Sequence, residues 1–418
     1  MKATKIFMMA ALALTFAACS NDDTDFAQQT DNNEITITAT VSSDDATTRA
    51  LSPDGSNIAS TWETTDQFAI LYNDGTSDVK RVATVSSING STVTITFTIP
   101  SSLASNTACT IVYPASAANA ANTGADVATA LAAQDGTIGN CPEVRVGTAT
   151  IDKDNHNLAG VTKLVAQNAI FKFTLQDLSA GAKSATEFKV SDGSGNVITT
   201  VTPGSASGEL YVALPVMAAG TYWFNATIDS KPYIAKATTA APTVAGKYYQ
   251  TTVKMATIGD VILSDGKFAA PSSTGTKVAM IAYLGNGSDC TNGLAIQLNA
   301  SPASMGWSAA CSYSSYPSIT GNPGTWRLPS KADWQNMVVG CAKSGDAGAS
   351  DYMNPIAGFK EKIGATGITW QSSNAYWSST DSGSKAWVVD VYLYSSTYAY
   401  FFERDTSGPF YVLGCLAF

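Results

Sequence analysis

The chain has 418 residues, enough for two or three domains with cores of their own, and carries a formal net charge of −9 with only 14% charged residues. This acidic and weakly charged composition argues against a nucleic-acid partner, which a basic surface would attract. The one histidine, His156, lies in the polar segment KDNHNLAG, so the sequence offers little for His-based acid–base catalysis or for a multi-histidine metal site.

The first 18 residues have the pattern of an export signal. Lys2 and Lys5 give a positive start, and the apolar stretch 6–18 is too short to span a bilayer as a stable helix. The stretch ends in FAAC, which resembles a bacterial lipobox and implies that Cys19 is lipidated and becomes the mature N-terminus. SNDDTD, directly after it, resembles the acidic tag of lipoproteins on the outer face of the outer membrane in some anaerobic Gram-negative bacteria. We therefore expect a lipid-anchored chain exposed on the cell surface, the alternative being an ordinary signal peptide with an incidental cysteine.

Short alternating segments follow a polar tether at 19–33. In EITITATVS, residues 34–42, apolar and polar residues alternate with the period of a half-buried strand. Similar runs recur as far as YYQTTVKM, with Gly, Pro, Asn and Asp between them, which predicts antiparallel sandwiches. We place one β-sandwich at 34–150 and a second at 151–256, and we expect the alanine-rich segment 115–133 to be a long surface connection with a helical turn.

Five segments occur in a fixed order along 34–256: TTRALSPDG, TWETTDQFAILY, CTIVYP, NAIFKFTL and GKYYQTTVKM. Together they resemble the fimbrillin family, the pilus subunits of anaerobic Gram-negative bacteria. The resemblance implies two tandem transthyretin-like β-sandwiches and a proteolytic cut after Arg49 that leaves Ala50 as the new N-terminus. It also implies assembly by β-strand addition, in which removal of strand 34–42 opens an apolar groove for a strand of another pilus subunit. The alternative is that Arg49 is a solvated loop residue and the strand stays in place.

The amino-acid composition changes beyond Thr257, where six of the eight tryptophans lie. LPSKADWQNMVVGCAKSG gives the clearest helix signal in the chain. Ser330 is placed to cap the helix and Asp333 to act as the acidic member of a capping box. The expected buried face comprises Trp334, Met337, Val338 and Cys341.

GTWRLPSKADW, AYWSSTDSGSKAW and the terminal LGCLAF resemble, in this order, the C-type-lectin-like fold of formylglycine-generating enzymes and FISUMP-type domains. The resemblance implies an α+β domain at 257–418 whose last strand, GCLAF, pairs beside the first strand and is core rather than a free donor. The sequence lacks the copper-binding cysteine pair of those enzymes near Cys415, as well as the Glu-Pro-Asn and Trp-Asn-Asp motifs of calcium-dependent sugar binding. We therefore expect no enzyme activity, no metal and no cofactor.

Apart from Cys19, six cysteines remain, and none of their spacings is CxxC, so a zinc site is not expected. In an exported chain they favour disulfide pairs within domains. The alternative is free buried thiols in an anaerobe. The six are Cys109, Cys141, Cys290, Cys311, Cys341 and Cys415.

The segment VVDVYLYSSTYAYFFERD, residues 388–405, predicts a hairpin because two alternating runs flank SST. Tyr392 and Tyr394 share one face and Tyr398, Tyr400 and Phe402 another. The inward side can be filled by Val389, Val391 and Leu393, which leaves the tyrosines pointing outward; the alternative is that the aromatic residues pack the core. Trp377 and Trp387 are expected in that core.

Outward tyrosines suit ligand binding because each offers a broad contact area and loses little rotamer entropy. The stretch from WSST to LAF also resembles the variable region of proteins diversified by retroelements, which display changeable side chains on a lectin-like scaffold. We expect the ligand contacts to come from Tyr392, Tyr394, Tyr398, Tyr400 and Asp405.

These expectations combine into a fimbrial tip adhesin with a mainly β fold, bound to other pilus subunits by donor-strand addition. Its further partners would be the outer membrane, through the lipid, and a host or bacterial surface protein or glycan. The first alternative is a surface-anchored glycan-binding lipoprotein that never enters a pilus. The second is an oxidase or other enzyme, which would hold a metal in the purified domain.

Overall fold

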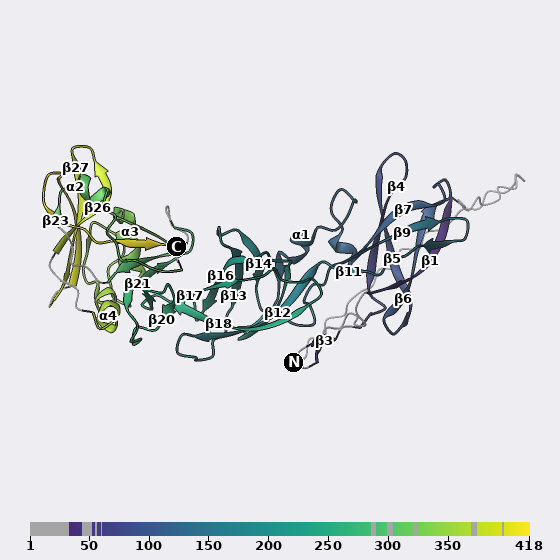
Figure 1. Cartoon of the computed structure of the whole chain (residues 1–418), viewed down its shortest axis with the longest axis horizontal. Helices are drawn as coiled ribbons and strands as arrows, with labels where there is room; N and C mark the ends of the chain where they lie inside the picture. The colour runs from purple at the N-terminus through teal and green to yellow at the C-terminus, as the bar shows by residue number, and fades with distance from the viewer. Residues whose placement is uncertain are drawn as a thin grey trace, which may run out of the picture.

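The computed structural model describes residues 33–43, 52–54, 57–59, 61–285, 290–298, 304–321, 324–368, 374–394 and 397–418. They form a mainly β, elongated molecule, in which successive sheets follow one another from one end to the other in chain order (Figure 1). Among these residues no helix has the length and apolarity needed to cross a membrane. The predicted lipidation and cleavage residues, Cys19, Arg49 and Ala50, lie outside the described residues.

The first sheet has eight strands and curls until its ends meet. β10 pairs with β1 on one side and with β9 on the other, which closes the sheet around an apolar core that includes Phe68, Ile70 and Ile95. The predicted first sandwich is thus a single closed sheet, because the twist of long strands carries the two edges together. The strand order is β10 (Asn157–Ala159), β1 (Glu34–Ser42), β6 (Thr92–Pro100), β5 (Asp78–Asn89), β4 (Gln67–Asn73), β7 (Thr107–Tyr113), β9 (Arg145–Asp152) and β11 (Val165–Ala166). A separate hairpin joins β2 (Ser52–Asp54) and β3 (Asn57–Ala59).

The predicted boundary between 150 and 151 falls inside β9. This strand pairs with β7, β10 and β11, all in the first sheet, whereas the second sheet, apart from its two-residue edge strand at 133–134, begins at Asn168. Apart from that edge strand, the sheets therefore change at Gln167. The sequence alternates on both sides of this point, so local pattern does not reveal the change.

The segment 115–133 holds a 3-10 turn, η1 (Ala115–Ala117), and one short helix, α1 (Val127–Leu131), which confirms the predicted helical turn. Most of the segment is exposed or half-buried, as expected of a surface connection, but three of its residues are buried. Ala115, Ala117 and Leu131 are buried in a cluster that contains Leu71, Val112 and Ala213 and therefore joins the first two sheets.

The second sheet folds into two layers with a core between them. β17 and β18 share only the pairs Tyr233–Thr257 and Ile234–Ala256, and the sheet divides there. The ring of Phe173 from one layer lies 5.3 Å from that of Phe188 in the other, so this unit is a β-sandwich. The strand order is β15 (Glu209–Pro215), β12 (Asn168–Asp177), β18 (Tyr248–Thr257), β17 (Lys231–Thr239), β16 (Gly220–Ile228), β13 (Glu187–Asp192), β14 (Val197–Val201) and β8 (Ala133–Gln134).

The C-terminal unit contains two six-stranded sheets and helices α2 (Trp307–Cys311), α3 (Lys331–Gly340) and α4 (Ala357–Ala365). One sheet has the order β20 (Phe268–Ala269), β19 (Val261–Leu263), β21 (Lys277–Leu284), β22 (Gly293–Gln297), β30 (Cys415–Ala417) and β24 (Thr325–Arg327). The other has the order β23 (Ser304–Met305), β29 (Phe410–Tyr411), β26 (Asn374–Ser382), β27 (Lys385–Leu393), β28 (Thr397–Asp405) and β25 (Tyr352–Met353). Residues of both sheets and of α3 and α4 meet in one core cluster.

Helix α3 begins as predicted. The Ser330 side chain accepts a hydrogen bond from the backbone N–H of Asp333, and the Asp333 carboxylate accepts one from the backbone N–H of Ser330. This capping box is confirmed, and so is the buried face of Trp334, Met337, Val338 and Cys341.

The C-terminal strand β30 is an internal strand of its sheet. It pairs with β22 on one side and with β24 on the other, and Leu416 is buried. The prediction that this segment is core is confirmed. Its neighbours differ from the predicted one, because β19, the first strand of this sheet along the chain, lies three positions away.

The last residue, Phe418, lies at the joint between the second and third units. Its ring stacks on Trp223 of β16 at 6.0 Å, and its backbone N–H and C=O both bond to Gly293. Ile234 and Ala256 of the second unit pack in the same cluster as residues of β19, β21 and β30. Apolar contact thus couples the C-terminal unit to its neighbour.

Five of the six cysteines for which disulfides were expected are not paired in the described part of the chain. Cys109, Cys141, Cys311, Cys341 and Cys415 are free thiols. Burial raises the pKa of Cys109 and of Cys341 to about 12, so these thiols stay protonated at neutral pH and behave as small apolar core groups. Cys109, Cys141, Cys341 and Cys415 are buried, whereas Cys311 is exposed.

Candidate ligand-binding face

The hairpin of β27 and β28 separates its side chains by alternation. The two strands pair in register over nine residues, from Lys385–Asp405 to Leu393–Thr397. The inward set, which is buried in the core of the unit, comprises Val389, Val391, Leu393, Ala399 and Phe401. The intervening tyrosines therefore point away from that core, as predicted.

The tyrosines of the two strands lie on one face. Tyr392 is directly opposite Tyr398, so the two sets that the sequence placed on separate faces form one surface. The rings of this pair stack 5.2 Å apart with an interplanar angle of 10°, and Tyr394 lies 5.4 Å from Tyr392. The separate-face prediction was wrong because cross-strand register is set by the turn and by the core, and neither is visible within one run.

A further tyrosine joins this face from a distant segment. β25 pairs with β28, and Tyr352 lies opposite Tyr400. The Tyr352 ring is 5.9 Å from that of Tyr400 and 6.0 Å from that of Tyr398. Phe402 extends the row, since its ring stacks on Tyr400 at 5.3 Å. We call this surface the aromatic platform; it consists of Tyr352, Tyr392, Tyr394, Tyr398, Tyr400 and Phe402.

The aromatic platform is accessible and held in place. Tyr394 is 56% exposed, Tyr352 52% and Tyr400 45%, which are among the largest values for big apolar side chains in the described residues. The Lys360 ammonium donates a hydrogen bond to the Tyr394 carbonyl at 2.6 Å, and the Asn354 amide donates one to the Tyr352 hydroxyl at 3.0 Å. A cluster of exposed aromatic residues of this kind is typical of a binding surface.

One carboxylate lies within the same face. Asp390 is opposite Tyr400 in the hairpin, on the same face as Tyr398. Burial raises the pKa of Asp390, and the influence of the Tyr398 hydroxyl only partly offsets this effect. Sequence reasoning missed Asp390, although its spacing of two and four residues from Tyr392 and Tyr394 assigns it to the same side of the strand.

Asp405, the predicted acidic contact, is separated from the tyrosines. It is exposed and pairs with Lys385 at the opposite end of the hairpin. Five residues of strand separate it from Tyr400, roughly 17 Å. The structure therefore does not bring it to the aromatic platform.

The two tryptophans predicted for the core differ in their surroundings. Trp377 is fully buried, and its indole N–H donates to the Met305 carbonyl at 2.7 Å. Trp387 is only partly buried; the Lys331 ammonium lies 3.2 Å from the centre of its ring. Trp377 is core as predicted, whereas Trp387 lies at the edge of the core.

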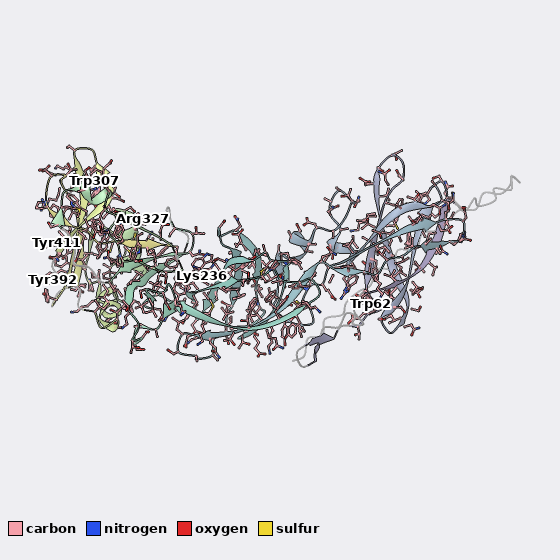
Figure 2. The ribbon with its side chains drawn as sticks, viewed as in Figure 1. Trp62, Lys236, Trp307, Arg327, Tyr392 and Tyr411 are labelled. Carbon is pink, nitrogen blue, oxygen red and sulfur yellow. The ribbon has the colours of Figure 1, made fainter. Side chains whose placement is uncertain are left out.

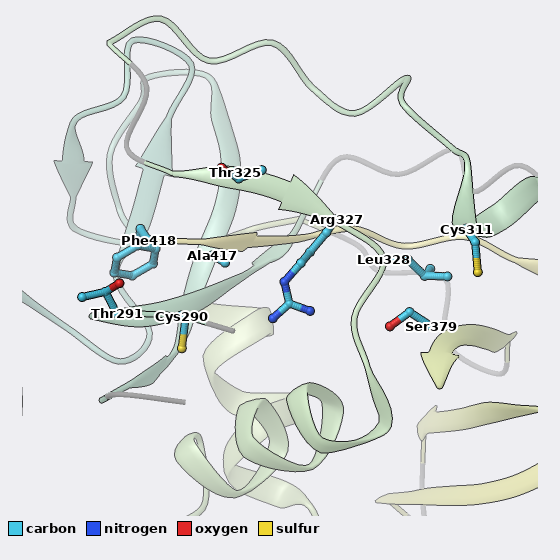
Figure 3. Close-up of a pocket in the computed structure, with 9 residues that line it drawn as sticks. All are labelled: Cys290, Thr291, Cys311, Thr325, Arg327, Leu328, Ser379, Ala417 and Phe418. Carbon is cyan, nitrogen blue, oxygen red and sulfur yellow. The ribbon is translucent and has the colours of Figure 1, made fainter. Parts of the chain in front are cut away.

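A cavity of about 620 Å³ lies elsewhere in the C-terminal unit (Figure 3). Its one charged lining side chain, Arg327, is bound by the Asp333 carboxylate, and the lining set contains no histidine and no carboxylate. Burial raises the pKa of Cys311, with a smaller effect of Asp381 in the same direction, so this thiol is not activated as a nucleophile. The cavity is lined by Cys290, Thr291, Cys311, Thr325, Arg327, Leu328, Ser379, Ala417 and Phe418.

The position of the aromatic platform in the molecule is distinctive. Figure 2 shows Tyr392 at one end of the elongated chain, with Trp62, which packs in the core of the first sheet, toward the other end. Within the described ranges, no group of three or more His, Cys, Asp or Glu side chains is arranged to hold a metal ion. The face presents aromatic rings and one carboxylate, which suits non-covalent recognition.

No protein-family model and no curated protein match this chain. Several solved structures resemble it at low identity. A fimbrial protein from Bacteroides ovatus is 13% identical, with 92% of this chain and 99% of that chain covered and a TM-score of 0.27. A fimbrial assembly protein from Parabacteroides distasonis is 10% identical over 52% of this chain and 90% of its own, with a TM-score of 0.27. A shaft pilin from Lactobacillus rhamnosus is 11% identical over 54% of this chain and 98% of its own, with a TM-score of 0.24.

Proposed function

We propose that this chain is a cell-surface fimbrial tip adhesin that binds a host or bacterial surface ligand through the aromatic platform. The observation that carries the proposal is the gathering of six aromatic side chains from β25, β27 and β28 on one accessible face. Aromatic side chains at the centre of an interface supply most of its binding energy. The face lies at one end of the molecule, where a tip subunit would present it (Figure 2).

The scaffold under the aromatic platform supports a C-type-lectin-like display domain. Its core is closed by the C-terminal strand β30, which lies between β22 and β24. The platform strands pack their inward residues against α3 and α4 in the same core. A strand held on both sides does not offer a free edge to another subunit, so β30 supports a terminal position rather than a shaft position.

The first sheet supplies the features that strand addition requires. β1 pairs with β6 over nine residues, but its contact with β10 on the other side is the single pair Thr38–Asn157. Its inward residues Ile37 and Val41 are fully buried. Removing β1 would uncover the apolar core against which these side chains pack, together with the edge of β6, and a strand of another pilus subunit could fill the resulting groove.

This route to assembly predicts binding of a replacement strand. A chain that begins at Ala50 should bind a labelled peptide with the sequence of β1, EITITATVS, measured by fluorescence polarisation. Substituting Ile37→Asp in the peptide should weaken binding by about a hundredfold, because an unpaired carboxylate in an apolar groove costs several kcal/mol. The matched control is Thr38→Asp, which places the same charge at an exposed position of β1. Equal binding of both substituted peptides would exclude insertion in the native register.

Processing and anchoring are tested on cells. We expect mass spectrometry of the mature protein to find an N-terminus at Ala50 on copies assembled into fimbriae, and a lipidated Cys19 on precursors held in the outer membrane. The cut at Arg49 releases the strand that otherwise fills the groove, which is why it must precede assembly. A lipidated Cys19 on every copy would instead identify a stationary surface lipoprotein.

The adhesin role itself is tested by probing arrays of host and bacterial glycans and surface proteins with the full mature chain. We expect at least one specific hit that is lost when the aromatic platform is altered. The absence of any hit, or a hit that does not depend on the platform, contradicts the proposal.

A further inference from the structure

Asp390 is a partly accessible carboxylate on the same face as the aromatic rings. Tyr398, whose hydroxyl influences the pKa of Asp390, has its ring 5.2 Å from that of Tyr392 and 6.0 Å from that of Tyr352. Tyr400 is opposite Asp390 across the strand pair. The negative charge therefore borders the aromatic platform, two residues from Tyr392 along β27 and opposite Tyr400.

Among the described residues, no ion pair involves Asp390. Two cations of the chain contact other parts of the aromatic platform: Lys360 donates to the Tyr394 carbonyl, and the Arg404 guanidinium lies 4.5 Å from the centre of the Phe402 ring. Burial consequently dominates the environment of Asp390 and raises its pKa.

The rings themselves favour a positive charge. The face of an aromatic ring attracts a cation, and the attraction grows when water is excluded. Arg404 on Phe402 shows that this row of rings already accepts one guanidinium from its own chain. Tyr400, the next ring in the row, stacks on Phe402 at 5.3 Å and is the cross-strand neighbour of Asp390.

We propose that the aromatic platform selects a lysine or arginine side chain of a partner polypeptide, which lies against the rings of Tyr398 and Tyr400 and pairs with Asp390. This inference rests on the proposed ligand-binding role of the platform. The basis of the inference is charge complementarity. Because Asp390 is half-buried and forms no ion pair among the described residues, it gains most from a partner cation that pairs with it in a contact from which water is excluded. The net charge of −9 would assist the approach of such a basic partner.

The test uses pairs of immobilised peptides that differ at one central residue: lysine against norleucine, and arginine against citrulline. Surface plasmon resonance with the full mature chain should show at least tenfold tighter binding of the cationic member of each pair. Asp390→Asn should remove this preference. Asp381→Asn is the matched control, because it removes one negative charge from an exposed position of β26 and should leave the preference unchanged.

Each outcome separates this inference from the proposed function. If no peptide binds, or if Asp390→Asn and Asp381→Asn act alike, selection of a cation by Asp390 is overturned. If peptides or array ligands bind through the tyrosines but norleucine and citrulline serve as well as lysine and arginine, the adhesin proposal stands and the cation inference falls. If binding survives replacement of the tyrosines, the proposed ligand-binding role of the aromatic platform is contradicted. The cation inference, which rests on that role, is then overturned as well.

Discussion

Replacing Tyr392 and Tyr398 together by alanine should lower the affinity of the chain for its surface ligand by at least about a hundredfold. The two rings stack 5.2 Å apart on paired strands, so they form one contact area at the centre of the aromatic platform. Loss of a central aromatic contact commonly costs 2 kcal/mol or more in binding free energy, and about 1.4 kcal/mol corresponds to a factor of ten. Because the rings touch, their effects are not expected to be additive.

The array hit supplies the ligand for this measurement, and dissociation constants of parent and variants are compared by surface plasmon resonance. Circular dichroism and thermal unfolding should be unchanged, since both side chains point away from the core. Val197→Ala and Val216→Ala are matched controls, because they remove exposed apolar groups from the second sheet and its border. Undiminished affinity of the double variant would place the binding site elsewhere.

Asp333→Ala should destabilise the C-terminal unit by about 3–5 kcal/mol in free energy of unfolding. The Asp333 side chain is only 3% exposed and binds both terminal nitrogens of Arg327, one at 2.9 Å. It also accepts hydrogen bonds from the backbone N–H of Ser330 at 2.7 Å and from its hydroxyl at 2.8 Å. Alanine would remove the buried carboxylate that binds Arg327 and half of the capping box of α3. Urea unfolding followed by tryptophan fluorescence measures the loss.

The same carboxyl gives this prediction a pH dependence. Burial raises the pKa of Asp333, but the hydrogen bonds from Arg327 and Ser330 outweigh it, and the net pKa lies below the usual value. A lowered pKa in the folded state contributes stability that is present above about pH 4 and is lost as the pH falls through the folded-state pKa. The difference between parent and Asp333→Ala should therefore shrink in acid. As a control, Lys267→Ala breaks an exposed ion pair with Asp265 and should lower the free energy of unfolding by less than about 1 kcal/mol. A similarly small loss for Asp333→Ala would contradict the prediction.

The sequence by itself determined the features that depend on neighbouring residues. The capping box of Ser330 and Asp333 lies within one helical turn, so its residues identify it without a partner from elsewhere. Strand β1 has the predicted bounds, and alternation assigned Val389 and Val391 to the inside and the tyrosines to the outside. These properties follow from the periods of a helix and a strand.

Tertiary structure alone decided which of these local faces meet. Tyr352 comes from a two-residue strand with no recognisable pattern, and it reaches the aromatic platform only because β25 pairs with β28. Cross-strand register placed Tyr392 opposite Tyr398, set Asp390 among the rings and carried Asp405 away from them. The end of the first sheet at Gln167 and the stacking of Phe418 on Trp223 likewise depend on partners far along the chain. Local periodicity fixes the side of a strand on which a residue lies, whereas register and sheet order depend on which distant surfaces bury one another.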